Sequence, residues 1–235
     1  MSDKYQEDQT KYLRRFSVPI IFKPNFFNTK GKRHSGRGFA ISPRHVMTNQ
    51  HVVDAKDGKY HVAGLSPRAI KRIVTARELG FGQSPRELDI AIIEFYHPHG
   101  LPIVHLAQAD PKVNDMLMFT NKHGSLLFGR LHFTGTHLDC LKRMHASGLI
   151  NLNDRHYDQG RRALNFMDKP YPGFASMYTG ISVIPGDSGS PLFDQTGAVV
   201  GIFHSLDTIT RQGMAHTVSD MYRVMNAYYT HYGKK

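Results

Sequence analysis

The stretch "GDSGSPLF", residues 186–193, places a serine directly after an aspartate and between two glycines, with a proline just beyond. Glycine adopts backbone conformations that other residues reach only at a cost, so such a run commonly forms a tight turn between strands. The apolar stretch "GAVVGI" follows at residues 197–202. Ser188 therefore belongs to a turn, or it is a reactive group whose partners lie elsewhere in the chain.

Short apolar segments alternate with turn residues over most of the chain. Most are too short for helices, and their β-branched and aromatic content indicates strands. The expected strands are "SVPIIF" (17–22), "GFAIS" (38–42), "HVMT" (45–48), "KYHVAGL" (59–65), "RIVTA" (72–76), "DIAIIEF" (89–95), "DMLMFT" (115–120), "SLLFGRLHF" (125–133), "GISVI" (180–184) and "AVVGIFHSL" (198–206). The pattern predicts a β-rich body, a barrel or a sandwich.

The C-terminal stretch has the period of an amphipathic helix instead. The apolar positions of this helix are Val218, Met221, Tyr222, Met225, Tyr229 and Tyr232. Thr217 and Asp220 have the spacing of a capping box at its start. We expect one closing helix packed on the β body.

Composition limits the class of protein. The 235 residues are 40% hydrophobic, enough for one large domain or two small packed ones, and the single cysteine, Cys140, excludes an intrachain disulfide. The first 16 residues lack the apolar core of a secretory signal, and no stretch has the length of a membrane span. These features predict a soluble chain without a membrane partner, with the cytoplasm, or a host-cell cytoplasm, as the favoured compartment.

Basic residues outnumber acidic ones, 30 to 19, which gives a net charge of +11. Such a charge favours anionic partners. The basic clusters lie at 30–37, 67–72 and 160–162, without a recognisable nucleic-acid motif. Both a solvated basic surface and a nucleic-acid groove fit this pattern.

A serine nucleophile needs a general base, and the base needs an orienting carboxylate. Of the 15 histidines, His51 stands out because it follows the apolar strand in "GFAISPRHVMTNQHVVD", residues 38–54. Asp89 opens the apolar strand in "LDIAII", residues 88–93, where a carboxylate is costly unless a buried group needs it. His51, Asp89 and Ser188 are therefore the candidate catalytic residues.

These three contexts carry a family resemblance. "GRGFAIS" leads to "TNQHVV", "LDIAII" follows, and "GDSGSPLF" precedes "GAVVGI", in the His, Asp, Ser order of the chymotrypsin template. Over residues 36–202 the chain resembles trypsin-like serine peptidases of the chymotrypsin fold, in style closest to HtrA-type and glutamyl-endopeptidase-type bacterial members and to viral chymotrypsin-like proteases.

The resemblance implies an all-β fold of two packed antiparallel six-stranded Greek-key β-barrels with a C-terminal α-helix. The expected organisation is an N-terminal extension over 1–15, a first barrel with His51 and Asp89 over 16–110, a second barrel with Ser188 and the specificity pocket over 111–216, and a helix with its tail over 217–235.

The resemblance also implies roles. Ser188 attacks the scissile carbonyl, His51 acts as base and then as acid, Asp89 orients His51, and the amides of Gly186 and Ser188 form the oxyanion hole. A protein or polyprotein is the implied substrate, and no metal or organic cofactor is needed. The alternative is a basic protease-like scaffold whose main role is to bind nucleic acid or an acidic protein.

Asp187 departs from the digestive members, in which the equivalent acid pairs with an N-terminal amine released by cleavage. The N-terminal region holds no segment like Ile-Val-Gly-Gly. Asp187 therefore needs another donor or solvent, and we expect activity without zymogen cleavage.

The resemblance places the specificity pocket at Ser182, Val183, Phe203, His204 and Ser205. In glutamyl endopeptidases and several viral members, a histidine that reads Glu or Gln directly follows the Gly-Ile pair, whereas Phe203 intervenes here. Strand alternation would put Phe203 in the pocket and turn His204 away unless a bulge intervenes. A hydrophobic or mixed P1 preference and an acidic or amide one both fit.

Two further stretches contain metal-ligating residue types, "HPHG" at 97–100 and "HFTGTHLDC" at 132–140. Their spacing fits no standard zinc pattern, so we expect no metal there. Residues 139–175 are rich in charge and turn formers and are expected to form an elaborated loop region. Asp139 and Asp207 are expected in loops.

Overall fold

The computed structural model of the chain describes residues 3–24, 35–55, 58–81, 88–135, 146, 176–206 and 213–233, without the side chains of residues 3–6, 176 and 206. Several sequence predictions lie outside these residues. They concern Asp139, Cys140, Asp207 and all of the stretch 139–175 except residue 146.

The N-terminal half forms an open antiparallel sheet of six strands in the order β4-β1-β2-β3-β6-β5. The strands are β1 (Val18–Pro24), β2 (Ser35–Ser42), β3 (His45–Thr48), β4 (Gly58–Val62), β5 (Ile70–Thr75) and β6 (Ala91–Phe95), and the short helices α2 (Gln50–Val53) and η1 (Pro67–Ala69) connect them. Along β1, alternate residues are buried, as expected for a strand with one face on a core.

The C-terminal half forms a closed six-stranded barrel in the order β10-β11-β12-β9-β8-β7. Its strands are β7 (Met116–Thr120), β8 (Leu126–Gly135), β9 (Ser176–Thr179), β10 (Pro191–Phe193), β11 (Val199–Leu206) and β12 (Gly213–Thr217). The predicted fold class is therefore confirmed, with one difference. The first sheet is a half-barrel, because its outer strands β4 and β5 do not pair with each other in the described structure.

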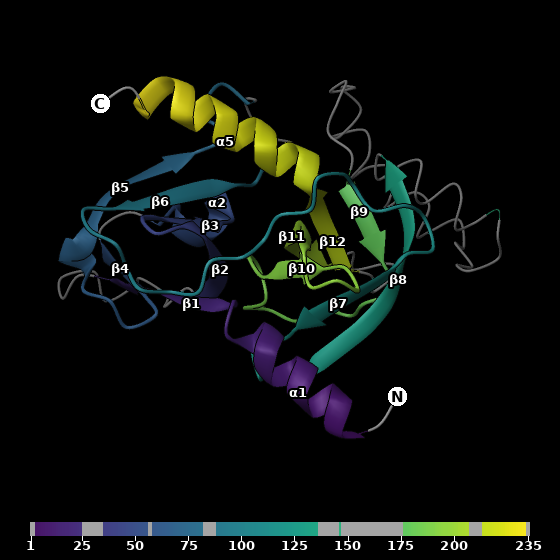
Figure 1. Cartoon of the computed structure of the whole chain (residues 1–235). Coiled ribbons are helices and arrows are strands. Elements are labelled where there is room, and N and C mark those ends of the chain that lie inside the picture. The colour runs from purple at the N-terminus through teal and green to yellow at the C-terminus, as the bar shows by residue number, and fades with distance from the viewer. Residues whose placement is uncertain are drawn as a thin grey trace, which may run out of the picture.

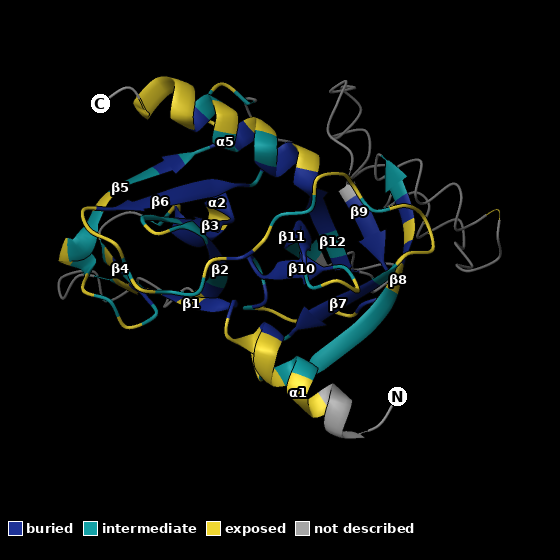
Figure 2. Ribbon diagram, in the orientation of Figure 1, coloured by how far each residue is buried: buried dark blue, intermediate teal, exposed yellow. Residues whose placement is uncertain are grey.

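The three larger apolar clusters of the described residues form the core. One fills the first sheet around Ile20 and Ile93, and another fills the second barrel around Leu131 and Phe203. The largest contains residues of both halves, such as Phe39 and Ile202, together with residues of both terminal helices. Figure 2 shows these buried strands between the more exposed helices. The two halves therefore share one core.

The C-terminal helix α5 (Val218–Tyr232) was predicted, and it contacts β11 and β12 (Figure 1). Its capping box is present. The Thr217 hydroxyl accepts a hydrogen bond from the Asp220 N–H at 3.2 Å, and the Thr217 backbone N–H donates a hydrogen bond to the Asp220 carboxylate. The predicted apolar face is partly wrong. The buried residues are Val218, Asp220, Met221, Val224 and Tyr228, whereas Tyr229 and Tyr232 are exposed.

The N-terminal helix α1 (Asp3–Arg14) was not predicted. It contacts β7 at the opposite side of the molecule from α5 (Figure 1). Leu13 and the following Phe16 are buried in the shared core. With so few apolar residues, the segment has too weak a periodicity for recognition, and packing stabilises the helix.

Some predicted strands need correction. Residues 180–184 form no strand, although Ile181 accepts a hydrogen bond from Gly213. The strand expected over 59–65 stops at Val62, because Ala63 and Gly64 have positive φ angles of 49° and 78°. Three strands, β9, β10 and β12, were missed because they are short and contain Gly, Ser, Thr or Pro, which weaken a strand pattern.

Candidate active site

His51 lies on α2, the single turn of helix that follows β3. The preceding Asn49 is fully buried and donates a hydrogen bond from Nδ2 to the Asp89 carbonyl at 2.7 Å. This bond ties α2 to the start of β6. The His51 side chain remains half exposed.

The Asp89 carboxylate holds His51 through two hydrogen bonds. Its Oδ2 lies 2.5 Å from His51 Nδ1, and its Oδ1 accepts the His51 backbone N–H at 2.9 Å. The carboxylate thus fixes both the ring and the backbone to which the ring is attached. Because Nδ1 faces the carboxylate, Nε2 is the nitrogen available to a further group.

The pair also sets the charge state of both groups. Burial disfavours the imidazolium, but the hydrogen bond and the charge of Asp89 outweigh it, so the pKa of His51 is raised. Burial likewise disfavours the Asp89 carboxylate, but the hydrogen bond and charge of His51 outweigh it and lower the Asp89 pKa. The arrangement therefore stabilises a protonated His51 beside an ionised Asp89.

Two further histidines lie against Asp89. His216, from β12, accepts the Asp89 backbone N–H at its Nε2 at 3.1 Å, and its ring stacks on His204, from β11, at 4.3 Å between centroids. Burial lowers the pKa of His204 to about 3 and that of His216 to about 4, so both rings are neutral at pH 7. His216 was missed from the sequence, where nothing distinguishes it from the other histidines.

Ser188 lies in a turn that depends on two glycines. Gly186 and Gly189 have φ angles of +97° and +86°, in the region that other residues rarely adopt. The Ser188 hydroxyl donates to the His204 carbonyl at 3.4 Å. On β2, a Cβ at Gly36 would lie 3.1 Å from the Ser188 carbonyl and would collide with Val52 of α2. The missing side chain therefore lets α2 and the serine turn approach the same residue.

Asp187, in the same turn, is a deeply buried carboxylate with 1% of its surface exposed. Its Oδ1 accepts the backbone N–H of Lys122 at 2.7 Å, and its Oδ2 accepts that of Ile184 at 3.0 Å. The sequence predicted that Asp187 needs a hydrogen-bond donor other than an N-terminal amine, or solvent, and two backbone amides are its donors. Lys122 lies in the β7–β8 connection and was not identified from the sequence.

The family model of the trypsin-like peptidase domain matches residues 36–202. The chain belongs to the trypsin-like serine peptidase family. The matched segment contains His51, Asp89 and Ser188, and it includes parts of both sheets.

Two curated relatives from Mycobacterium tuberculosis strains are the serine proteases MT3772 and Rv3671c. Each is 29% identical over 168 residues, which is 71% of this chain and 35% of the relative. The match thus spans about a third of the length of these relatives. Among solved structures, the active form of the M. tuberculosis Rv3671c protease aligns with a TM-score of 0.60 at 18% identity, over 96% of this chain and 86% of that one. Its inactive form aligns with a TM-score of 0.56, and these likenesses show the shared fold.

The five predicted pocket residues of this trypsin-like chain lie in different environments. Phe203 is buried in the barrel core, 4.7 Å from Phe119 between ring centroids, and Val183 belongs to the same cluster. His204 faces His216, and Ser205 lies 2.8 Å from His204 Nδ1 through its Oγ. Ser182 is exposed. A bulge between Phe203 and Ser205 interrupts the β11–β12 pairing.

The described part of the chain shows neither a metal-binding cluster nor a membrane-spanning helix. No group of three or more His, Cys, Asp or Glu side chains among those residues has an arrangement that would hold a metal ion. Within the same part of the chain, no helix has the length and apolarity needed to cross a bilayer.

Proposed function

We propose that the chain is a serine endopeptidase that hydrolyses peptide bonds through a His51–Asp89–Ser188 triad and an acyl-enzyme intermediate. The contact of His51 Nδ1 with Asp89 Oδ2 at 2.5 Å carries this proposal. It leaves Nε2 as the base for a serine proton, in a chain of the trypsin-like family. The raised pKa of His51 also supports its role as an acceptor of that proton.

In the first step, His51 Nε2 takes the proton of Ser188 Oγ while Oγ bonds to the scissile carbonyl carbon. The tetrahedral intermediate then loses its C–N bond, and the leaving amine receives the proton from His51. In the second step, His51 takes a proton from water, whose oxygen attacks the acyl carbon. The Ser188 ester bond breaks, Oγ regains the proton, and the acid product leaves.

The N–H groups of Gly186 and Ser188 are the proposed oxyanion hole. The φ of +97° at Gly186 supports this assignment, because such a conformation turns the peptide plane in a way that few side chains tolerate. Both proposed donors belong to one turn, and donors that are fixed before the reaction stabilise a developing oxyanion without a cost of reorganisation.

The proposed substrates are proteins or polyproteins, and the proposed preference at P1 is hydrophobic or mixed. His204 is neutral at pH 7, stacks on His216 and lies near Asp89, so its ring is engaged on the side of the triad. A histidine in this position is poorly placed to read an acidic P1 group. Cleavage-site mapping on a peptide library tests the preference, and strict cleavage after Glu would contradict it.

The decisive test compares the wild type with Ser188→Ala, using turnover of casein and of a peptide library together with labelling by a fluorophosphonate probe. We expect the wild type to be labelled at Ser188, and Ser188→Ala to lose labelling and at least 1,000-fold of turnover, roughly the size of triad effects. Ser219→Ala, at an exposed serine of α5, is the matched control and should behave as wild type. Equal turnover by wild type and Ser188→Ala would overturn the proposal. The absence of turnover in both proteins would also overturn it, and would favour the alternative of a protease-like scaffold that binds nucleic acid or an acidic protein.

A further inference from the structure

Arg37 links three segments that are distant in the sequence. Its Nη1 donates to the carbonyl and the hydroxyl of Ser17, at 3.2 and 2.6 Å, and its Nη2 donates to the Lys122 carbonyl at 3.1 Å. Ser17 immediately precedes β1, and Lys122 lies in the β7–β8 connection. One side chain of the first sheet is therefore bound to both the N-terminal segment and the second barrel.

Lys122 in turn holds the serine turn at two points. Its backbone N–H donates to Asp187 Oδ1 at 2.7 Å, and its Nζ donates to the Pro185 carbonyl at 2.8 Å. The peptide groups on both sides of Lys122 are thus engaged, one by Asp187 and one by Arg37. A shift of the Arg37 side chain would release the residue that positions Asp187.

The backbone of Arg37 binds the other side of the same turn. Its N–H donates to the Ser188 carbonyl at 2.7 Å, and its carbonyl accepts the Thr48 hydroxyl at 2.6 Å. Arg37 therefore contacts Ser188 directly through its main chain and approaches Asp187 through Lys122. The two residues after Gly186 are held from one position on β2.

The opposite charges of Arg37 and Asp187 also connect these two residues. A carboxylate buried as deeply as Asp187 is costly unless a cation or sufficient donors compensate it. Burial lowers the pKa of the Arg37 guanidinium, and the negative charge of Asp187 opposes this effect, so the two groups interact electrostatically. Arg37 thus supplies positive charge to a carboxylate whose described hydrogen bonds come from neutral amides.

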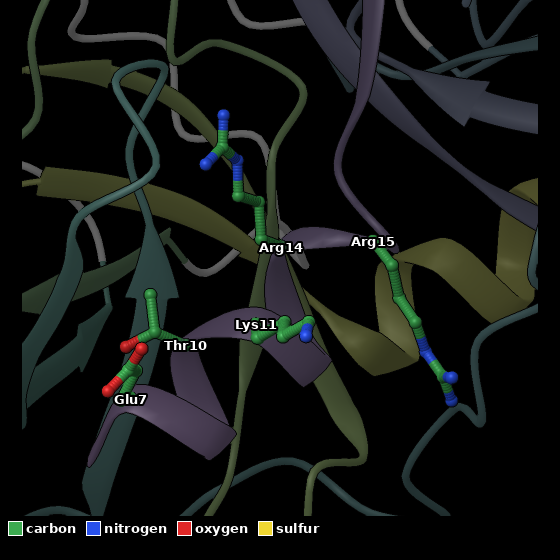
Figure 3. Close-up of a pocket in the computed structure, with 5 residues that line it drawn as sticks. All are labelled: Glu7, Thr10, Lys11, Arg14 and Arg15. Carbon is green, nitrogen blue, oxygen red and sulfur yellow. The ribbon is translucent and has the colours of Figure 1, made fainter. Parts of the chain in front are cut away.

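Helix α1 reinforces the β7–β8 connection from outside. Arg14, the last residue of α1, and the following Arg15 point in different directions (Figure 3). Arg15 lies over the rings of Tyr12 and Phe16, whereas the Arg14 guanidinium packs so closely on Gly124 that a Cβ there would meet it at 2.8 Å. The connection that contains Lys122 is therefore packed against α1 as well as bound to Arg37.

We propose that Arg37 is a positioning residue that, together with Ser17 and Lys122, holds the turn 185–189 in the geometry that the oxyanion hole requires. This inference rests on the proposed function. The described hydrogen-bond partners of Asp187 are backbone amides, and none is an N-terminal amine. In this proposal, the internal Arg37 supplies the support that an N-terminal amine gives in digestive members of the family.

The expected effect falls on the transition state. The oxyanion donors bind a charge that exists fully only in the tetrahedral intermediate, so a misplaced turn lowers kcat while leaving KM nearly unchanged. A general loss of structure would instead lower the fraction of active protein and the melting temperature together. The split between kcat and KM therefore separates positioning from folding.

The experiment measures kcat, KM, the fluorophosphonate labelling rate and thermal unfolding for Arg37→Ala, Arg37→Lys and Ser17→Ala. We expect kcat and the labelling rate of Arg37→Ala to fall by about tenfold or more, but by less than the roughly 100- to 1,000-fold loss caused by removing an oxyanion donor, because the donors are displaced and not removed. KM should stay within about twofold. Arg37→Lys should be intermediate, because an ammonium keeps the charge but not the fork that reaches Ser17 and Lys122. Added guanidinium, at a non-denaturing concentration, should partly restore Arg37→Ala.

The matched control is Arg68→Ala, which removes the same charge from an exposed position on η1 and should leave kcat unchanged. Wild-type kcat in a folded Arg37→Ala would overturn the inference. If that variant does not fold, unchanged kcat in both Arg37→Lys and Ser17→Ala would do so. Failure of the proposed function is a different result, because turnover would then persist in Ser188→Ala or be absent from the wild type.

Discussion

His51 and Asp89 form the pair whose charge state sets the proposed reaction's response to pH. A general base works only when it is unprotonated, so activity falls as pH drops through the pKa of His51. That pKa is raised above its ordinary value of 6.5 because the hydrogen bond and charge of Asp89 outweigh burial. The acidic limb of the kcat/KM profile should therefore lie above pH 6.5.

Asp89→Asn tests this relation. The amide removes the charge that raises the pKa of His51 and favours the wrong imidazole tautomer, so we expect kcat to fall by roughly 10⁴-fold. The acidic limb of the remaining activity should move to lower pH. A pH series of kcat/KM measures both effects. Asp115→Asn, at an exposed aspartate, is the control, and an acidic limb that stays in place in Asp89→Asn would contradict the assignment.

Single residues differed in how far the sequence could identify them. His51, Asp89 and Ser188 each lie in a local context that is unusual for their type, and the structure brings His51 and Asp89 into contact. The donors to Asp187 could not be predicted, because they are backbone amides of Lys122 and Ile184, and any residue type supplies an amide. The contacts of Arg37 could not be predicted either, because its sequence context indicates only a basic cluster and the start of the "GRGFAIS" motif.

At the scale of elements, α5 is anchored to the first sheet by one buried carboxylate. Glu94 lies on β6, and its side chain is only 8% exposed. It contacts three cations, Arg44 at 3.5 Å, Lys71 at 2.7 Å and Arg72 at 2.9 Å, and it accepts the Tyr228 hydroxyl of α5 at 2.6 Å. Burial disfavours this carboxylate, but the bonds from Lys71 and Tyr228 outweigh it and lower the Glu94 pKa.

Glu94→Gln should lower the free energy of unfolding at pH 7 by about 2 kcal/mol, because the cations lose their buried counter-charge. The folded-state pKa of Glu94 is depressed, so its stabilisation is present above the ordinary glutamate pKa and is lost as pH falls through the lower, folded value. The two proteins should therefore converge in acid. Urea unfolding at several pH values measures this, with Glu7→Gln on the exposed face of α1 as control. A difference that persists unchanged in acid would count against this account.

The elements also show where sequence patterns were sufficient. Helix α5 has a capping box and a clear apolar period, and both helix and cap were predicted. Its buried line passes through Tyr228 rather than Tyr229, because Tyr228 bonds a carboxylate on another element, which no helical period reveals. Helix α1 and strands β9, β10 and β12 are stabilised mainly by packing and pairing with distant segments, so their local patterns are weak.

At the scale of the whole molecule, His204 and His216 join the two halves. They come from strands of the second barrel, and His216 accepts the N–H of Asp89, which leads into the first sheet. Their burial lowers both pKa values, to about 3 and about 4. Protonation of either ring would place a charge in the seam between the halves, beside Asp89 and His51, so the neutral pair favours the assembled fold.

This arrangement predicts how stability depends on pH. A histidine with a depressed folded-state pKa stabilises the protein fully above its unfolded pKa of 6.5, and this contribution is lost as pH falls toward the folded value. For His216 the loss between pH 6.5 and 4 is about 3 kcal/mol. His216→Gln keeps an acceptor for the Asp89 N–H but cannot be protonated, so its free energy of unfolding should fall less steeply over this range. Chemical unfolding measured between pH 6.5 and 4 tests this, with His61→Gln on the outer strand β4 as the control. If the free energy of unfolding fell equally steeply with pH in His216→Gln and in the wild type, the histidine pair would not couple protonation to the packing of the two halves.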